Sequence, residues 1–117
     1  MVNEVLDGSA TGGLRGSVFK NVLGESFIDL AFRAAHEADP SAKLYINEYS
    51  LDGPGAKLTG MVNLINRLKS RGVQIDGVGT QLHLVLGQTD GVQSALETLA
   101  ATGLDVAITE LDIRYVA

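Results

Sequence analysis

The sequence has no cysteine and no tryptophan, and its aromatic residues are limited to three tyrosines and three phenylalanines. Without cysteine the chain forms neither disulfide bonds nor thiolate metal sites, so the redox compartment stays open. A metal centre needs three or four convergent ligands, and the chain has only two histidines to offer beside its carboxylates. We therefore expect neither a metal ion nor another cofactor.

Basic residues and long apolar runs are also scarce. Nine lysines and arginines stand against fourteen aspartates and glutamates, which gives a net charge of −5, and the basic residues do not cluster. A protein that binds the phosphate backbone needs such a cluster. No apolar run reaches the roughly 18 residues of a membrane span, and the N-terminus has no signal-peptide pattern. We expect neither nucleic acid nor a membrane as a partner.

The apolar residues, 45% of the chain, alternate between strand-like runs and helical stripes. The predicted strands are 2–4, 43–49, 75–83 and 105–112. The predicted helices are 27–35, 56–71 and 92–99, with a short helical turn near 18–23. Gly72 fits the left-handed position after the second helix, Asp90 and Gln93 resemble a capping box before the third, and 106–108 is apolar enough for a strand buried on both faces.

Short connections of about three to five residues join each helix to the next strand, which is typical of βα units. Right-handed crossovers then place the strands side by side and parallel. The sequence therefore predicts an α/β fold in which four parallel strands are connected by three main helices. The 117 residues are enough for one domain, whereas a whole (β/α)₈ barrel needs about 250 residues.

Every predicted strand ends in polar residues, which a core would reject. In parallel α/β folds the functional groups collect at these strand ends. Two carboxylates, such as those at the ends of the first and last strands, form the pair that commonly cleaves glycosidic bonds. Residues two apart in a strand share a face, so Gln81 should lie beside His83, and Glu110 beside Asp112. The strand-end residues are Asn3, Glu4, Asn47, Tyr49, Gln81, His83, Glu110 and Asp112.

Four ordered segments of the chain resemble the motifs of the glycoside hydrolase family 10 endo-β-1,4-xylanases. They are Val2-Asn3-Glu4, Asn47-Glu48-Tyr49-Ser50, Gln81-Leu82-His83 and Thr109-Glu110-Leu111-Asp112. The resemblance covers essentially the whole chain. It implies a partial TIM (β/α)₈ barrel, with residues 1–117 as an internal segment of one catalytic barrel from its fourth strand to just beyond its seventh.

The resemblance also implies roles. Glu4 is the general acid/base and Glu110 the nucleophile, with carboxyl groups about 5–5.5 Å apart for a retaining mechanism. His83 lies against Glu110 and is oriented by Asp112. The substrate-binding residues are Asn3, which donates to the sugar 2-hydroxyl, Asn47, Gln81, and Tyr49 on the leaving-group side. The family usually has Asn-Asp-Tyr-Asn where this chain has Asn47-Glu48-Tyr49-Ser50, which puts contacts on that side in doubt.

The implied activity is endo-hydrolysis of β-1,4-xylan or xylo-oligosaccharides by a secreted enzyme that needs no cofactor, with the isolated segment inactive. One alternative is another retaining barrel glycosidase, such as a cellulase or mixed-linkage glucanase. A non-catalytic carbohydrate-binding half-barrel is a second, although binding alone does not need both carboxylates. An unrelated doubly wound binding domain is a third, but Gly77-Val78-Gly79 lies inside a strand and makes a poor dinucleotide fingerprint. We expect these small residues to let neighbouring backbones or a ligand approach closely.

Overall fold

The computed structural model describes residues 2–8 and 12–116. At its centre is a four-stranded, entirely parallel sheet in the order β1-β2-β3-β5. Its strands are β1 (Val2–Asn3), β2 (Tyr45–Glu48), β3 (Gly77–Thr80) and β5 (Asp105–Ile108). The helices are α1 (Val18–Leu23), α2 (Ser26–Ala38), α3 (Ala56–Ser70) and α4 (Val92–Ala100). The prediction of four parallel strands joined by three main helices, α2 to α4, is confirmed, and α1 is the predicted short turn.

Helix α3 shows how the sequence pattern produces the core. Leu58, Met61, Leu64, Ile65 and Leu68 form its buried apolar face, and Val62 at the border of that face is partly exposed. Gly72 follows the helix with a φ of 69°, the left-handed conformation expected there. Across the described residues, 2–8 and 12–116, no helix is both long and apolar enough to cross a bilayer.

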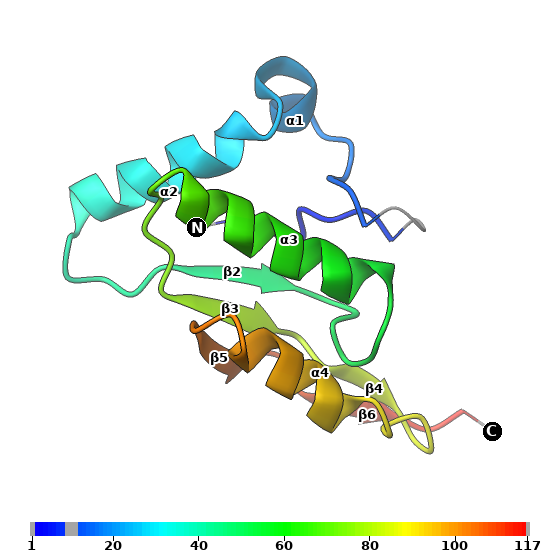
Figure 1. Ribbon diagram of the computed structural model, residues 1–117. Helices are drawn as coiled ribbons and strands as arrows, with labels where there is room; N and C mark the ends of the chain where they lie inside the picture. Colours follow the sequence, from blue (N-terminus) through cyan, green and yellow to red (C-terminus); the bar gives the residue numbers. More distant parts are fainter. Residues whose placement is uncertain (1, 9–11, 117) are drawn as a thin grey trace.

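The two faces of the sheet differ. Helices α3 and α4 lie across one face (Figure 1), and Ile46 and Val78 are completely buried in the core that these helices share with the sheet. Tyr45 and Asn47 alternate with the buried residues of β2 and are partly exposed. Side chains that point to this open face therefore remain accessible, and they include several of the predicted site residues.

The glycines of β3 make room for side chains of the neighbouring strands, whereas the sequence led us to expect the approach of backbone or ligand. A Cβ atom on Gly77 would overlap the ring of Tyr45, and one on Gly79 would press against the side chains of Asn47 and Thr109. The absence of side chains at these two positions lets Tyr45 and Asn47 lie flat over β3. The open face is thus shaped at its centre by backbone rather than by bulky residues.

The two longest strand predictions are wrong at their C-terminal ends. The predicted strand 75–83 is broken, because Leu82 has a φ of 46° and leaves the extended conformation. A new strand β4 (His83–Val85) then pairs in parallel with β6 (Asp112–Arg114), and these form a separate two-stranded sheet. The alternation argument for shared faces therefore fails, since neither Gln81 and His83 nor Glu110 and Asp112 belong to one continuous strand.

Two local predictions are also wrong. Helix α4 is preceded by Gly91 as its N-cap without a side-chain cap hydrogen bond, and the Gln93 side chain donates instead to Glu97 (2.9 Å). The capping box of Asp90 is therefore absent. Strand β5 is not buried on both faces, because it lies at the edge of the sheet and Ile108 is 49% exposed.

Candidate active site

The predicted site residues lie where the parallel strands end. Asn3 is the last residue of β1 and stands beside Asn47 of β2 in the strand register. Asn47 in turn is paired with Gly79 of β3, which is paired with Ala107 of β5. The short turn after β5 then carries Thr109 and Glu110 past the ends of its neighbours. Register thus brings together side chains that are more than a hundred residues apart in the sequence.

Asn47 is the central hydrogen-bonding group. Its Nδ2 donates to Oδ1 of Asn3 (2.8 Å) and to Oε1 of Glu110 (3.2 Å). Its own Oδ1 accepts a hydrogen bond from Oγ1 of Thr109 (2.7 Å). An ionised carboxylate only accepts hydrogen bonds, so the contact with Glu110 fixes which end of the amide is the donor. The two N–H groups are therefore directed toward Asn3 and Glu110.

Gln81 continues this chain of amides to the second carboxylate. It is only 2% exposed, and its Nε2 donates to Oδ1 of Asn3 (3.4 Å) and to Oε1 of Glu4 (3.2 Å). Glu4 and Glu110 are therefore connected through Gln81, Asn3 and Asn47. Because each amide contacts its neighbours on two sides, the side chains of this network restrict one another's orientations.

His83 bridges two carboxylates on the opposite side of Glu110. Its Nδ1 lies 2.6 Å from Oδ2 of Asp112, the residue opposite it in the β4–β6 register, and its Nε2 lies 3.4 Å from Oε2 of Glu110. The hydrogen bond to Asp112 raises the pKa of His83, and the charges of Asp112 and Glu110 raise it further. The predicted contact of His83 with Glu110 and its orientation by Asp112 are both present.

Glu110 thus has a polar partner at each carboxylate oxygen: Asn47 donates to Oε1, and Nε2 of His83 faces Oε2 at ion-pair distance. An ionised carboxylate only accepts hydrogen bonds, so it fits both contacts. The side chain is still 47% exposed on the open face. The arrangement holds a carboxylate in a defined direction while leaving it accessible to a ligand.

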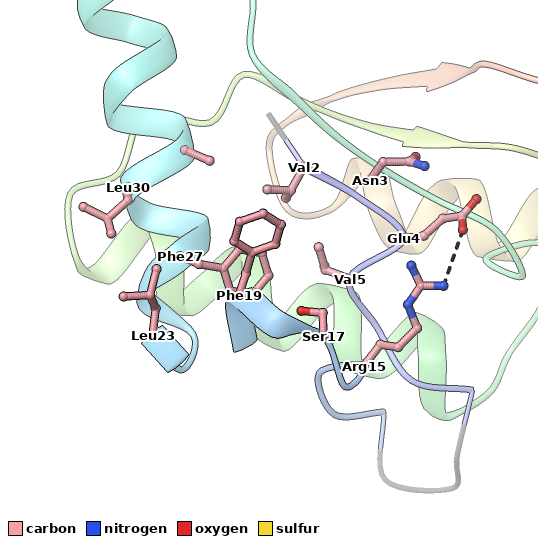
Figure 2. Close-up of a pocket in the computed structure, with 11 residues that line it drawn as sticks. Val2, Asn3, Glu4, Val5, Arg15, Ser17, Phe19, Leu23, Phe27 and Leu30 are labelled. Carbon is pink, nitrogen blue, oxygen red and sulfur yellow. Dashed lines mark ion pairs between the residues drawn. The ribbon is translucent and has the colours of Figure 1, made fainter. Parts of the chain in front are cut away.

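Glu4 has a different environment and a partner that sequence reasoning missed. Its backbone has a φ of 54°, which is unusual for a residue other than glycine. Its Oε2 lies 3.5 Å from Nη1 of Arg15, while Oε1 accepts from Gln81. Figure 2 shows the guanidinium and the carboxylate facing each other above the loop that follows β1. Arg15 belongs to a glycine-rich loop without periodicity, and no spacing rule pointed to it.

Tyr49 is the one predicted site residue for which no hydrogen bond to this network is found in the described part of the chain. Nζ of Lys57 lies 3.1 Å from the centre of the Tyr49 ring and 2.8 Å from Oε1 of Glu48. Sequence reasoning identified Glu48 only as a departure from a motif, whereas its carboxylate is completely buried. The tyrosine is thus held through a buried ion pair instead.

In residues 2–8 and 12–116 no group of three histidine, cysteine or carboxylate side chains is arranged to hold a metal ion. Chemically, the site offers two carboxylates with different partners, one beside an arginine and one beside a histidine. Such a pair can supply a proton donor and a nucleophile on opposite sides of a substrate bond.

The chain is similar to known proteins in both sequence and fold. The sequence profile of glycosyl hydrolase family 10 matches residues 1–117. The chain belongs to this family. Endo-1,4-beta-xylanase A of Phanerodontia chrysosporium is 50% identical over 115 residues, which are 97% of this chain and 28% of that protein. Exoglucanase XynX of Acetivibrio thermocellus is 43% identical over 97% of this chain and 10% of its own length.

Among solved family 10 structures, the intracellular xylanase TsXylA of Thermoanaerobacterium saccharolyticum superimposes with a TM-score of 0.90 and 42% identity. The match covers 95% of this chain and 34% of TsXylA. Glutamate-to-alanine variants of TsXylA have been solved with xylotriose and with xylotetraose. The chain spans about a third or less of the length of the first curated relatives that it matches, from 28% to 34%. The four parallel strands therefore fit a partial family 10 TIM barrel.

Proposed function

We propose that this chain carries the catalytic pair of an endo-1,4-β-xylanase that cleaves xylan or xylo-oligosaccharides with retention. The observation that supports the proposal most directly is the chain of hydrogen bonds from Glu4 through Gln81, Asn3 and Asn47 to Glu110. A retaining glycosidase needs two carboxylates about 5–5.5 Å apart in fixed orientations. A continuous network between them supplies that fixed relation.

In the first step, Glu4 donates its proton to the glycosidic oxygen while a carboxylate oxygen of Glu110 attacks the anomeric carbon. The bond to the leaving sugar breaks, and a glycosyl ester forms on Glu110. In the second step, Glu4, now ionised, takes a proton from water, and the water oxygen displaces Glu110 from the anomeric carbon. Two inversions at one carbon give net retention, and Glu4 is protonated again for the next cycle.

The other residues of the network orient these two groups and the sugar. Asn3 is positioned as a donor to the sugar 2-hydroxyl, a contact that strengthens as positive charge develops at the anomeric carbon. Asn47 and His83 hold the two oxygens of Glu110, and Asp112 orients the imidazole. Tyr49 lines the leaving-group side of the cleft in this assignment. No cofactor takes part in either step.

We propose further that residues 1–117 form the segment from the fourth strand to just beyond the seventh of a single (β/α)₈ barrel. Strands β1 and β5 are the two edges of the described four-stranded sheet. Beside β1, an apolar cleft of about 700 Å³ is lined by Val2, Phe19, Phe27 and Leu30 (Figure 2). A closed barrel would cover both edges with neighbouring βα units, which supports this proposal.

The experiment is a chimeric barrel in which residues 1–117 replace the matching segment of TsXylA, which is about a third of that chain. We expect the chimera to hydrolyse xylan and to release the β-anomer first, as followed by NMR. The Glu110→Ala chimera should fold and be inactive. Initial release of the α-anomer, or xylan hydrolysis that survives Glu110→Ala, would contradict the proposal.

A glucan-cleaving relative of the same family supports one second candidate, hydrolysis of β-1,4-glucan, because Exoglucanase XynX is 43% identical over this segment. The relative rates of the complete enzyme on xylan and on carboxymethylcellulose separate the two substrates. We expect a clear preference for xylan. We also propose that the complete enzyme is secreted, since a polymeric substrate lies outside the cell, although TsXylA is described as intracellular. Activity in the culture supernatant rather than in the cell extract tests this.

A further inference from the structure

The loop after β1 presents Arg15 to the carboxyl group of Glu4, in a contact that the catalytic scheme above does not use. Nη1 of Arg15 lies 3.5 Å from Oε2 of Glu4, and the arginine side chain is 49% exposed. An exposed pair at this distance contributes little to folding stability. We instead expect the contact to affect the orientation of the Glu4 carboxyl group, because a small change in that orientation alters the rate of proton transfer by Glu4.

The backbone around Arg15 is fixed more firmly than its exposure suggests. The backbone N–H of Arg15 donates to the carbonyl oxygen of Val5 (2.7 Å), and that of Asp7 donates to the carbonyl oxygen of Gly13 (2.7 Å). Leu6 and Leu14 form an antiparallel bridge between these two contacts. The returning part of the loop is thus hydrogen-bonded to the segment that directly follows Glu4.

Helix α3 holds the same loop from the other side. Gly12 is buried, and a Cβ atom on Gly60 would overlap its carbonyl oxygen. This close approach requires glycine in the helix and locks the loop against α3. The position of the Arg15 backbone relative to β1 is therefore set by the sheet and the helix together.

Glu4 in turn needs external support. Its φ of 54° is a strained conformation for a residue with a side chain, and such strain persists only where the surroundings enforce it. Gln81 donates to Oε1 and Arg15 faces Oε2, so the carboxyl group is held by one partner at each oxygen. Figure 2 shows the side chain of Arg15 extending from the loop to the carboxyl group of Glu4.

We propose that Arg15 is a positioning residue for the general acid/base, an inference that rests on the proposed retaining function. The arginine guanidinium stays protonated and does not act as an acid or a base. Arg15 therefore influences proton transfer only through the orientation of Glu4. Arg15 holds the carboxyl group in the direction that serves proton donation in the first step and proton removal from water in the second. It has no role in the attack by Glu110.

This assignment predicts a specific kinetic pattern for Arg15→Gln in the chimeric barrel. An aryl xylobioside with a very good leaving group needs no acid in the first step, so its kcat/KM should stay within about twofold of the parent. Its kcat, limited by the second step, and the kcat/KM for xylan should both fall about three- to fivefold, within the range of one exposed charge contact. Azide, a nucleophile that needs no general base, should restore kcat for the activated substrate.

Two control variants and one comparison of substrates test whether Arg15 is a positioning residue. Arg15→Lys keeps a positive charge and should lose less than Arg15→Gln. Arg33→Gln removes another exposed arginine, one whose guanidinium donates to the carbonyl of Arg71, and should leave all rates unchanged. A merely structural role of Arg15 would lower kcat/KM equally for the activated substrate and for xylan, without azide rescue, and would overturn the inference.

The inference and the proposed function fail in different ways. A folded parent chimera that does not hydrolyse xylan would overturn the proposed function and the inference together. An active parent with unchanged rates in Arg15→Gln would overturn the inference alone. If Arg15→Gln did not fold, the same comparison of substrates would be made with Arg15→Lys, where an equal loss on both substrates would again overturn it.

Discussion

The buried pair of Glu48 and Lys57 allows a prediction whose sign as well as size follows from the structure. Glu48 is completely buried, and Lys57 is 7% exposed. The Glu48 carboxylate accepts hydrogen bonds from Nζ of Lys57 (2.8 Å) and from the backbone N–H groups of Leu6 (2.9 Å) and Tyr49 (3.1 Å). It therefore joins the segment after β1, the end of β2 and the first turn of α3.

Removal of one partner of such a pair leaves the other as an uncompensated buried charge. Lys57→Met should therefore destabilise the protein by about 3–5 kcal/mol. Glu48→Gln alone should also destabilise it, because the lysine loses its counter-charge. In the Lys57→Met background, however, Glu48→Gln should stabilise the protein, since it removes the unpaired buried charge. The gain is smaller than the loss from Lys57→Met, because Leu6 and Tyr49 donate to different oxygens of Glu48 and glutamine keeps an oxygen for only one of them.

Thermal unfolding of the chimeric barrel at one scan rate measures these effects. The chimeric barrel is about three times as long as the 117-residue chain, and for a protein of that length about 1 kcal/mol corresponds to roughly 2 °C or less. Lys57→Met should therefore lower the unfolding midpoint of the chimera by roughly 5–10 °C. Lys43→Met, at an exposed position, is the control and should change it by about 1 °C at most. The reasoning is wrong if Lys57→Met matches this control, or if Glu48→Gln lowers the midpoint further in the Lys57→Met background.

Three further predictions follow from the site and from the sheet edges. Glu110→Ala should abolish turnover of every substrate in the chimera, whereas Glu4→Ala should lose about 10²–10⁴-fold on xylan and spare activated aryl glycosides in the first step; equal losses across leaving groups would refute these roles. The hydrogen bond to Asp112 raises the pKa of His83. The stabilisation from this contact is therefore complete below about pH 6.5, the ordinary pKa of histidine, and is lost as the pH rises through the raised value. Asp112→Asn should lower the unfolding midpoint more at about pH 5.5 than at about pH 9. An equal change at both pH values would contradict this sign. The isolated 117-residue chain should be aggregated, oligomeric or loosely folded and inactive on xylan, because apolar side chains such as Phe19 (62% exposed) and Val22 (77%) lie uncovered; a monomer in size-exclusion chromatography with one cooperative transition and xylan turnover would show the opposite.

The regular parts of the fold could be predicted because their signals are local and repeated. The apolar stripe of α3 marks its buried face at every turn, and β2 and β3 carry buried apolar residues followed by polar ones. Most of the candidate site could be predicted for the same reason, since its residues stand at or just beyond those strand ends. Periodicity placed the amides and carboxylates at the carboxyl ends of the strands, whereas their individual roles came only from the resemblance to the family.

The parts that could not be predicted depend on contacts between distant segments. Strand β4 exists only because His83–Val85 pairs with Asp112–Arg114, and three-residue strands have no periodicity of their own. Arg15 reaches Glu4 because Gly12 packs against α3, which is a tertiary contact. The buried position of Glu48 depends on Lys57, which is nine residues further along the chain and belongs to a helix.

The strand ends, where the strand predictions were wrong and where the site residues lie, also carry strained backbone conformations. The residues other than glycine that have a positive φ among those described are Glu4, Ser50 and Leu82. Each lies one or two residues beyond the end of β1, β2 or β3. A left-handed conformation costs such a residue on the order of 1–2 kcal/mol, so the surrounding contacts must enforce it.

Burial provides that enforcement, and the turns in return direct the functional groups. Leu51, directly after Ser50, is completely buried, and Leu82 itself is 2% exposed, so both turns are fixed by the core. The turn at Leu82 ends β3 and allows Gln81 to contact Glu4 while His83 contacts Glu110. A continuous strand with strict alternation would direct both side chains to one face and one partner. The turn at Leu82, which the strand prediction did not foresee, therefore lets Gln81 contact Glu4 and His83 contact Glu110.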